Sequence, residues 1–368
     1  MTSSSHGSDY IFLGLVIFLV LFGFLMLLSA SGPSGYASFG DSLYYVKHQL
    51  IFGLIPGIMG FIFAIFVPYQ IWKKYAWPIL LLTIVLLIFV FIPGIGAPFG
   101  TSKSWISVAG LFSIQPAEIA KLTLLFYMAA WFEERGEQKV KDLKSGFLPF
   151  LTVLGSIILL IGAQPDIGSM FVIVGMSLVV YFLAGAAWPH LFAFLAAGVG
   201  LLLLLIKLAP YRAARLTTFL YPELDPQGIG YHINQALLAI GSGGFWGLGY
   251  GHSRQKFHYL PEVFGDSIYA ILAEELGFII AVLLLIFFLY FFYRSMRIAF
   301  RSPDLFGTYL VMGIAGWIVL QAFVNIGSML ALMPMTGITL PFISYGGTSL
   351  AVCLTAVGVI FHISRYTK

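Results

Sequence analysis

The chain has 368 residues, of which 60% are hydrophobic and only 9% are Asp, Glu, Lys or Arg, whereas a soluble domain carries about 25% charged residues. A water-soluble fold of this size could not cover its surface with so few charges. The net charge of +4 is low and scattered, so no nucleic acid is expected as a partner, and the single cysteine, Cys353, excludes an intrachain disulfide.

Ten stretches are apolar and long enough to cross a bilayer, whose hydrocarbon core of about 30 Å needs roughly 17 to 25 residues of helix. We therefore predict an all-α, polytopic integral membrane protein, with one membrane domain over residues 1–368. The predicted spans are 10–30, 47–67, 76–95, 115–132, 147–163, 167–186, 188–207, 267–293, 305–332 and 346–363.

The fourth span opens with two opposite charges, Glu118 and Lys121, in the motif QPAEIAKL. Charged groups at the edge of a membrane are costly and are functional candidates by default. The i, i+3 spacing puts both on one helical face, where each can neutralise the other. A purely structural pair and a functional pair explain the spacing equally well.

The fifth and sixth spans are separated only by Gln164, Pro165 and Asp166. Pro and Asp together favour a break in the helix there. Asp166 either caps the sixth helix or lines a polar cavity on the outer side.

Residues 208–266 form the long hydrophilic connection of the chain, between spans seven and eight. Arg212 and Arg215, spaced i, i+3, could clamp a phosphate if that stretch is helical, although interfacial anchoring explains them equally well. An amphipathic run follows at 231–240, and then a glycine-rich stretch, GSGGFWGLGYG, at 241–251. Long ordered loops are usually functional.

Within that loop, glycines allow close backbone approach and positive φ. The stretch at 241–251 lacks the strand-before, helix-after setting of a nucleotide-binding fingerprint. The loop histidines, His232, His252 and His258, have no metal-ligand spacing, and we expect them to be solvated. Zinc-site, Walker and HExxH motifs do not occur in the sequence.

Asp266 opens the eighth span, where it is either a helix N-cap or a catalytic acid or base. Glu274 and Glu275 lie about 12 Å deeper, at 1.5 Å per residue, and on two different helical faces. We expect one of these two to point into the bundle and pair with a cation or a backbone amide, in a structural role.

Orientation follows from Lys and Arg in the short loops. With ten spans both termini lie on one side, and the short segments of that side hold eleven such residues, whereas the opposite short loops hold only Lys47 and Lys103. The eleven are Lys73, Lys74, Arg135, Lys139, Lys141, Lys144, Arg294, Arg297, Arg301, Arg365 and Lys368. We therefore predict cytoplasmic termini and an outward-facing 208–266 loop.

Several sequence blocks, from the first span to the last, resemble the SEDS family of shape, elongation, division and sporulation proteins, which includes FtsW, RodA and SpoVE. The blocks are QPAEIAKL (115–122), QPDIGS (164–169), the stretch from PYRAARL to EELGF (210–278) and NIGSMLALMPMTGITLPFISYGGTSL (325–350). The segment SRQKFHYLPE resembles the division-type branch, whereas Met335-Thr336-Gly337 lacks a Lys often seen in FtsW.

The resemblance implies a peptidoglycan glycosyltransferase that polymerises lipid II into glycan strands on the outer face of the bacterial cytoplasmic membrane. An Asp in the position of Asp266 is essential in that family, and Glu118, Lys121, Arg212 and Arg215 match its other motif positions. Four positions depart from the common pattern. Gly265, Ser267 and Tyr269 stand where many members have Thr, Phe and Phe, and Ala117 stands where Ser is common. The implied partner is a class B penicillin-binding protein, the crosslinking transpeptidase, beside other divisome or elongasome membrane proteins.

The predicted mechanism makes Asp266 the general base and gives the leaving diphosphate cationic contacts from Lys121, Arg212 and Arg215. Glu118 would position Lys121. A divalent cation, Mg or Mn, bridging Asp266 and the diphosphate is compatible with this scheme, although the sequence shows no dedicated ligand set. The alternatives are a lipid II flippase and a non-catalytic scaffold for a transpeptidase.

Overall fold

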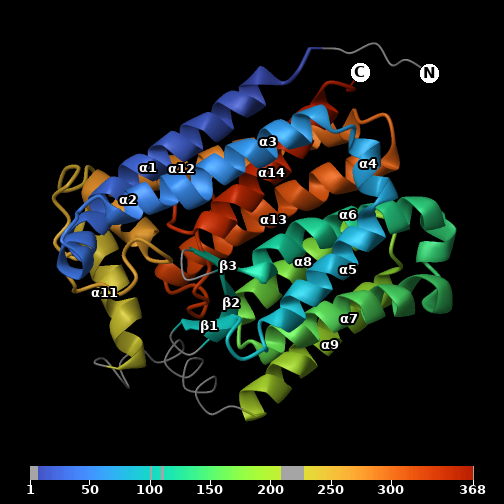
Figure 1. Ribbon diagram of the computed structural model, residues 1–368, viewed down its shortest axis with the longest axis horizontal. Coiled ribbons are helices and arrows are strands. Elements are labelled where there is room, and N and C mark those ends of the chain that lie inside the picture. The colour runs from blue at the N-terminus through green and yellow to red at the C-terminus, as the bar shows by residue number, and fades with distance from the viewer. Residues whose placement is uncertain (1–6, 100–101, 109–111, 209–227, 368) are drawn as a thin grey trace.

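The computed structural model describes residues 7–99, 102–108, 112–208 and 228–367 (Figure 1). Each of the ten predicted spans falls on helix. These helices are α1 (Tyr10–Phe39); α2 (Tyr44–Gln49), the π-helical turn η1 (Leu50–Leu54) and α3 (Ile55–Phe66) in succession; α5 (Ala76–Phe89); α6 (Pro116–Val140); the π-helical turn η2 (Leu143–Phe147) with α7 (Leu148–Ala163); α8 (Ile167–Leu183); α9 (Trp188–Leu208); α12 (Ile268–Phe300); α13 (Leu305–Met329); and α14 (Gly347–Ser364). Among the described residues, two further helices, α4 (Tyr69–Lys74) and α11 (Ile229–Ser242), lie in the connections.

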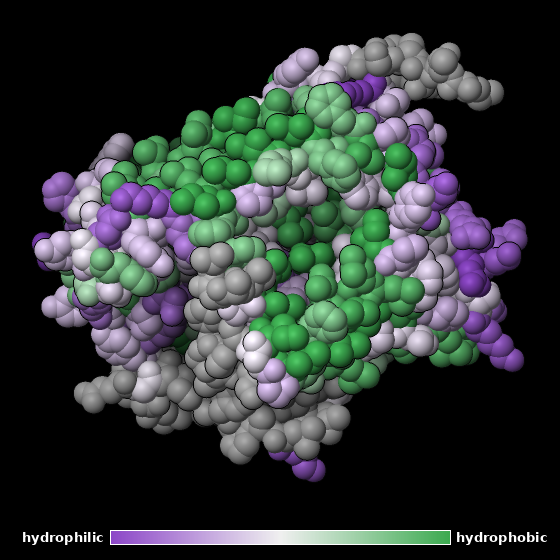
Figure 2. Space-filling model, viewed as in Figure 1, coloured by the Kyte–Doolittle hydropathy of each residue, from purple (hydrophilic) through white to green (hydrophobic). Residues whose placement is uncertain are grey.

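The helices make this a multi-pass membrane protein. Within the described residues, six helices are long and apolar enough to cross a membrane, when Tyr44–Phe66 and Leu143–Ala163 are each taken as one. Shorter apolar helices add Ala76–Phe89, Ile167–Leu183 and Trp188–Gly200. Figure 2 shows a broad hydrophobic band between hydrophilic ends, which is the surface that a bilayer requires.

A small antiparallel sheet fills the connection between α5 and α6, with strands β1 (Gly96–Phe99), β2 (Ser102–Val108) and β3 (Phe112–Ile114). Its register places Ile106 opposite both Gly96 and Ile114. The all-helical prediction holds for the spans, and the sheet is an addition to it. Strands this short carry too little periodicity to be recognised from sequence.

The centre of the bundle is α13, which packs against α6, α8, α12 and α14 and is buried along most of its length. It has no Asp, Glu, Lys or Arg, and a helix that is apolar all round belongs inside the bundle. Its C-terminal half nevertheless carries two fully buried amides, Gln321 and Asn325. These amides organise the site described below.

Close packing of α3 on α14 fixes where α14 begins. A Cβ on Gly57 would lie 2.5 Å from Cδ1 of Leu354, and one on Gly60 would lie 2.0 Å from Oγ1 of Thr355. Small residues at such an interface let two membrane helices approach closely. At the end of α2, Oε1 of Gln49 accepts a 3.0 Å hydrogen bond from the Gly346 amide, directly before α14.

The start of α1 and the end of α14 share one end of the bundle (Figure 1), where the Asp9 amide donates to Oγ of Ser364 at 3.2 Å. Asp9 also forms a 2.5 Å ion pair with Arg294 near the end of α12. The site occupies the opposite end.

Candidate active site

Asp266 lies in the turn directly before α12. The helix begins at Ile268 with Ser267 at the N-cap, so the interpretation of Asp266 as the N-cap does not hold. The Asp266 carbonyl accepts a 2.8 Å hydrogen bond from Nδ2 of Asn325 on α13. The backbone of Asp266 is therefore anchored, while the residue is only partly buried.

Two amides on α13, one helical turn apart, hold the segment that follows this helix. Nδ2 of Asn325 donates to the Ile338 carbonyl at 2.8 Å, and Nε2 of Gln321 donates to the Thr339 carbonyl at 2.9 Å. Asn325 therefore ties Asp266 to this segment. A buried amide with these partners specifies one local arrangement, because breaking it would leave polar groups unsatisfied.

The predicted pair of Glu118 and Lys121 forms at the start of α6. Nζ of Lys121 lies 2.6 Å from Oε1 of Glu118, and both side chains are buried. The same Nζ donates to Oε1 of Gln321 at 2.8 Å and lies 5.4 Å from the ring centroid of Trp317. A direct contact between Lys121 and a diphosphate would displace these partners, so the geometry favours a supporting role for Lys121.

The start of α14 lies beside the turn that carries Asp266. The Tyr345 amide donates to the Phe264 carbonyl at 2.8 Å, and the Tyr345 hydroxyl lies 2.8 Å from Nδ1 of His48. Burial raises the pKa of the Tyr345 phenol, which therefore stays neutral. The SYGG segment thus fixes the position of the backbone two residues before Asp266.

Asp166 connects the starts of three helices. It caps α8, the first of the two alternatives, by accepting a 2.9 Å hydrogen bond from the Ser169 amide. Its other carboxylate oxygen accepts from Nε2 of Gln115 at 3.1 Å. The Gln115 amide donates to Oγ1 of Thr348 on α14 at 3.2 Å. The predicted break is confirmed as well, since α7 ends at Ala163 and α8 begins at Ile167.

Side-chain hydrogen bonds therefore join the starts of α6, α8 and α14 at one end of the bundle, and the backbone bond between Tyr345 and Phe264 joins the segment before α12 to them. Helix N-termini carry partial positive charge and bind anions such as phosphate. This end of the bundle therefore combines the partly buried Asp266 with several helix N-termini, of which that of α8 is already capped by the Asp166 carboxylate.

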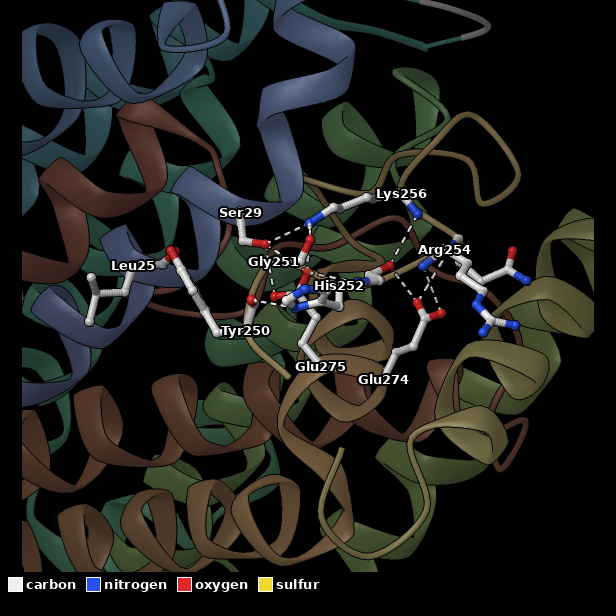
Figure 3. Close-up of polar contacts among 11 residues, drawn as sticks. Leu25, Ser29, Tyr250, Gly251, His252, Arg254, Lys256, Glu274 and Glu275 are labelled. Carbon is white, nitrogen blue, oxygen red and sulfur yellow. Dashed lines mark hydrogen bonds and ion pairs between the residues drawn. The ribbon is translucent and has the colours of Figure 1, made fainter. Parts of the chain in front are cut away.

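Glu274 and Glu275 are both buried and both structural (Figure 3). Glu275 forms a 2.8 Å ion pair with Lys256 and accepts from Oγ of Ser29 on α1 at 2.7 Å. Glu274 accepts from the Arg254 amide at 2.9 Å. The sequence predicts such a partner for one of the two acids, and both have one because residues 253–256 fold over this end of α12.

The glycine-rich stretch joins a break in α12. Gly277 has a φ of 79°, which interrupts the helix, and the freed backbone groups pair with the loop. The Phe278 amide donates to the Gly244 carbonyl at 2.9 Å, and the Leu248 amide donates to the Glu274 carbonyl at 3.0 Å. A Cβ on Gly277 would lie 2.4 Å from the Gly247 amide nitrogen. The close backbone approach predicted for these glycines is therefore a contact between two parts of the protein, the loop and α12.

Arg212 and Arg215 lie outside the described residues. Among the residues that the structure does describe, no three His, Cys, Asp or Glu side chains are grouped so that they could hold a metal ion. The divalent cation stays a prediction, and no step below depends on it.

Three residues that contribute to the site were not predicted from the sequence, namely Gln321, Asn325 and His232. Asn325 and Gln321 carry a usable signal, because amides in an apolar span must find buried partners. His232 was expected to be solvated, yet its Nε2 lies 2.6 Å from Oγ of Ser267. The expectation holds for His252 and His258, which are exposed.

Comparisons with known proteins connect this geometry to a family. Residues 9–368 match the profile of the FtsW/RodA/SpoVE family, described as "cell cycle protein". Stage V sporulation protein E of Bacillus subtilis (strain 168) is 42% identical over 369 aligned positions, with all of both chains covered. A probable peptidoglycan glycosyltransferase FtsW of Geobacter sp. (strain M18) is 40% identical, covering 98% of this chain and 97% of its own.

Solved structures share the fold over nearly the whole chain. The rod shape determining protein RodA of Thermus thermophilus superposes with a TM-score of 0.71 at 28% identity, over 98% of this chain and 99% of its own. Another solved structure is that of a peptidoglycan synthase complex, whose subject is the structural coordination of polymerization and crosslinking. One of its chains superposes with a TM-score of 0.80 at 27% identity, over 98% of this chain and 99% of its own.

Proposed function

Because the chain belongs to the FtsW/RodA/SpoVE family of cell cycle proteins, we propose that it polymerises lipid II into glycan strands at the outer face of the bacterial cytoplasmic membrane. The protein is a peptidoglycan glycosyltransferase, the activity in the names of FtsW relatives that are 37–40% identical to it. The observation that carries the proposal is Asp266, anchored by Asn325 beside linked helix starts. The neighbouring hydrophobic band suits a polyprenyl tail.

In the proposed reaction Asp266 is the general base. It takes the proton from the 4-hydroxyl of the acceptor sugar as that oxygen attacks the anomeric carbon of the donor. The new C–O bond forms as the bond to the diphosphate breaks, so undecaprenyl diphosphate leaves and the anomeric centre inverts. Anchoring of the Asp266 backbone by Asn325 supports this role, because a base needs a defined position relative to the attacking oxygen.

Charge on the leaving diphosphate would be stabilised by the helix starts of α6 and α14 and by Arg212 and Arg215. Lys121 and Glu118 act in support. Through Gln321 they hold the segment at Thr339.

We propose ten membrane spans in one membrane domain over residues 1–368, with both termini in the cytoplasm and loop 208–266 outside. The excess of Lys and Arg on the side of the termini supports this orientation. We further propose that a class B penicillin-binding protein is the working partner, together with other divisome or elongasome membrane proteins. The likeness to a chain of a peptidoglycan synthase complex supports the transpeptidase.

The rival functions are a lipid II flippase and a scaffold that only recruits a transpeptidase. Purified protein added to lipid II in detergent separates them, because detergent leaves no membrane to flip across. Polymer formation supports the enzyme. Its absence, with the transpeptidase also present, would contradict the polymerase.

Asp266→Ala should lower the rate of glycan-strand formation by at least about 10²-fold, the smaller end of what a positioned general base contributes. The measurement is the initial rate of polymer formation from lipid II by gel analysis. The matched control is Asp41→Ala, since Asp41 is an acid of the predicted outer side that pairs with an exposed Lys47. Near-normal polymerisation by Asp266→Ala, with the control equally active, would rule out the assigned role.

A further inference from the structure

A line of three side chains runs away from the proposed base. Oγ of Ser267 lies 3.3 Å from Oδ1 of Asp266 and 2.6 Å from Nε2 of His232 on α11. The same hydroxyl reaches the Pro261 carbonyl at 2.8 Å. Ser267 is fully buried, whereas His232 is partly exposed. A carboxylate and an imidazole are therefore connected through a single hydroxyl that water does not reach.

A polymerase that adds sugars repeatedly must release a proton from its base after every addition. A serine hydroxyl carries one hydrogen and two lone pairs. When it accepts a hydrogen bond from a protonated carboxyl, its single hydrogen can turn from the Pro261 carbonyl to a neutral imidazole nitrogen. Imidazole is the side chain whose ordinary pKa allows it to take and release protons near neutral pH.

We propose that His232 is the proton acceptor that regenerates the Asp266 carboxylate, with Ser267 as the relay. The inference rests on the proposed polymerase function. The proton on Oδ1 of Asp266 passes to Oγ of Ser267 as the hydroxyl proton of Ser267 passes to Nε2 of His232. The products are a carboxylate, an unchanged serine and an imidazolium, which loses its proton to water. Charge and atoms balance without a further reactant.

The surroundings of His232 suit this step. α11 packs against α12 and α13. At the facing end of α12, Glu274 and Glu275 are committed to residues 253–256, and the outer half of α13 carries no titratable side chain. Among the described residues, the other titratable side chains on these facing segments are Tyr231 on α11, Tyr269 on α12, and Glu262 and Asp266 just before α12. Nearby acids favour a transient imidazolium.

The simpler alternative is that the bond between His232 and Ser267 only holds α11 against α12. His232→Gln separates the two roles, because a glutamine can hydrogen-bond but cannot carry a proton away. The experiment measures kcat and KM for polymerisation of lipid II between about pH 5 and 8, the range in which imidazole titrates. The matched control is His252→Gln in the same loop, whose imidazole is exposed.

We expect kcat of the wild type to rise with pH through one inflection in this range. In His232→Gln that inflection disappears and kcat falls by about 10²-fold, as for loss of a positioned proton acceptor, while KM is unchanged. Ser267→Ala should reproduce this profile, and His252→Gln should match the wild type. Wild-type kcat and pH profile in His232→Gln would overturn the relay.

A folding defect is distinguished by adding imidazole to His232→Ala. Recovery of rate with increasing imidazole supports the relay, and no recovery in a protein of wild-type thermal stability contradicts it. Failure of the wild type itself to polymerise lipid II would instead contradict the proposed function.

Discussion

At the scale of single residues, the buried pair of Glu118 and Lys121 shows how charge is tolerated inside this protein. Both side chains are almost completely removed from solvent, and the ammonium group is further satisfied by Gln321. Removing one member of such a pair leaves an uncompensated buried charge, whereas replacing both with apolar groups is often neutral. Stability and function can therefore be separated at this pair.

Lys121→Met should lower the free energy of unfolding by about 3–5 kcal/mol, because Glu118 then loses its buried counter-ion. Glu118→Leu/Lys121→Met should recover most of that stability. Polymerisation should stay low in both variants, since neither holds Gln321 through the ammonium group. Thermal unfolding in detergent and the lipid II assay measure the two effects.

The control for this pair is Lys141→Met, which removes an exposed i, i+4 partner of Glu137 and should change neither quantity appreciably. A double variant that polymerises lipid II as fast as the wild type would show that the pair is only structural.

At this scale the sequence correctly predicted contacts between residues that are close together in the chain. The spacing of Glu118 and Lys121 brings them together within one helix, and Asp166 caps the helix that follows it. It failed for His232, whose partner Ser267 is 35 residues away. No local pattern places an α11 side chain against the start of α12.

At the scale of elements, α12 is two helical pieces joined at Gly277. Residues 243–249 supply the hydrogen bonds that the helix lacks there, and non-helical backbone at membrane depth requires such internal partners. The glycine-rich stretch and the helix break are therefore one structural unit, which places the piece of α12 that follows Asp266.

Gly277→Ala should destabilise the protein by about 1–3 kcal/mol, because a positive φ disfavours any side chain and the added Cβ would meet the Gly247 amide. The rate of polymerisation should also fall, because the added side chain shifts the part of α12 that follows Asp266. Thermal unfolding and the lipid II assay are again the measurements.

Gly155→Ala is the matched control. Gly155 lies in α7 with nothing within 4 Å of an added Cβ, and Ala is the better helix former, so stability should stay the same or rise slightly. Equal stability of the Gly277 and Gly155 variants would contradict the role of the break.

Hydropathy predicted the helices themselves because an apolar run of sufficient length has few other stable forms in a bilayer. It did not predict their interruptions. The break at Gly277 lies inside one predicted span, two residues after Glu275, and its pairing with residues 243–249 stabilises it.

At the scale of the whole molecule, the two ends of the bundle differ in kind. One end joins Asp9, Arg294 and Ser364, and the other holds the linked helix starts and Asp266. The proposed orientation places the second end outside the cell, where peptidoglycan is assembled.

Ser42→Cys should react with a membrane-impermeant maleimide in intact cells, whereas Gln138→Cys should react only after permeabilisation. Both positions are exposed and lie on opposite sides of the proposed topology, Ser42 in the turn between α1 and α2 and Gln138 near the end of α6. The native Cys353 is fully buried, so background labelling should be low. The reverse pattern of labelling would contradict the orientation.

The sequence by itself determined the membrane class, the helical ranges and the candidate acids, because bilayer length and the cost of buried charge act on each segment alone. The tertiary structure decided which distant groups meet. Asn325 fixes Asp266, Lys256 neutralises Glu275, and His232 reaches Ser267. Each of these contacts joins separate elements, and only the packing of helices around α13 and the loop over α12 brings them within hydrogen-bonding distance.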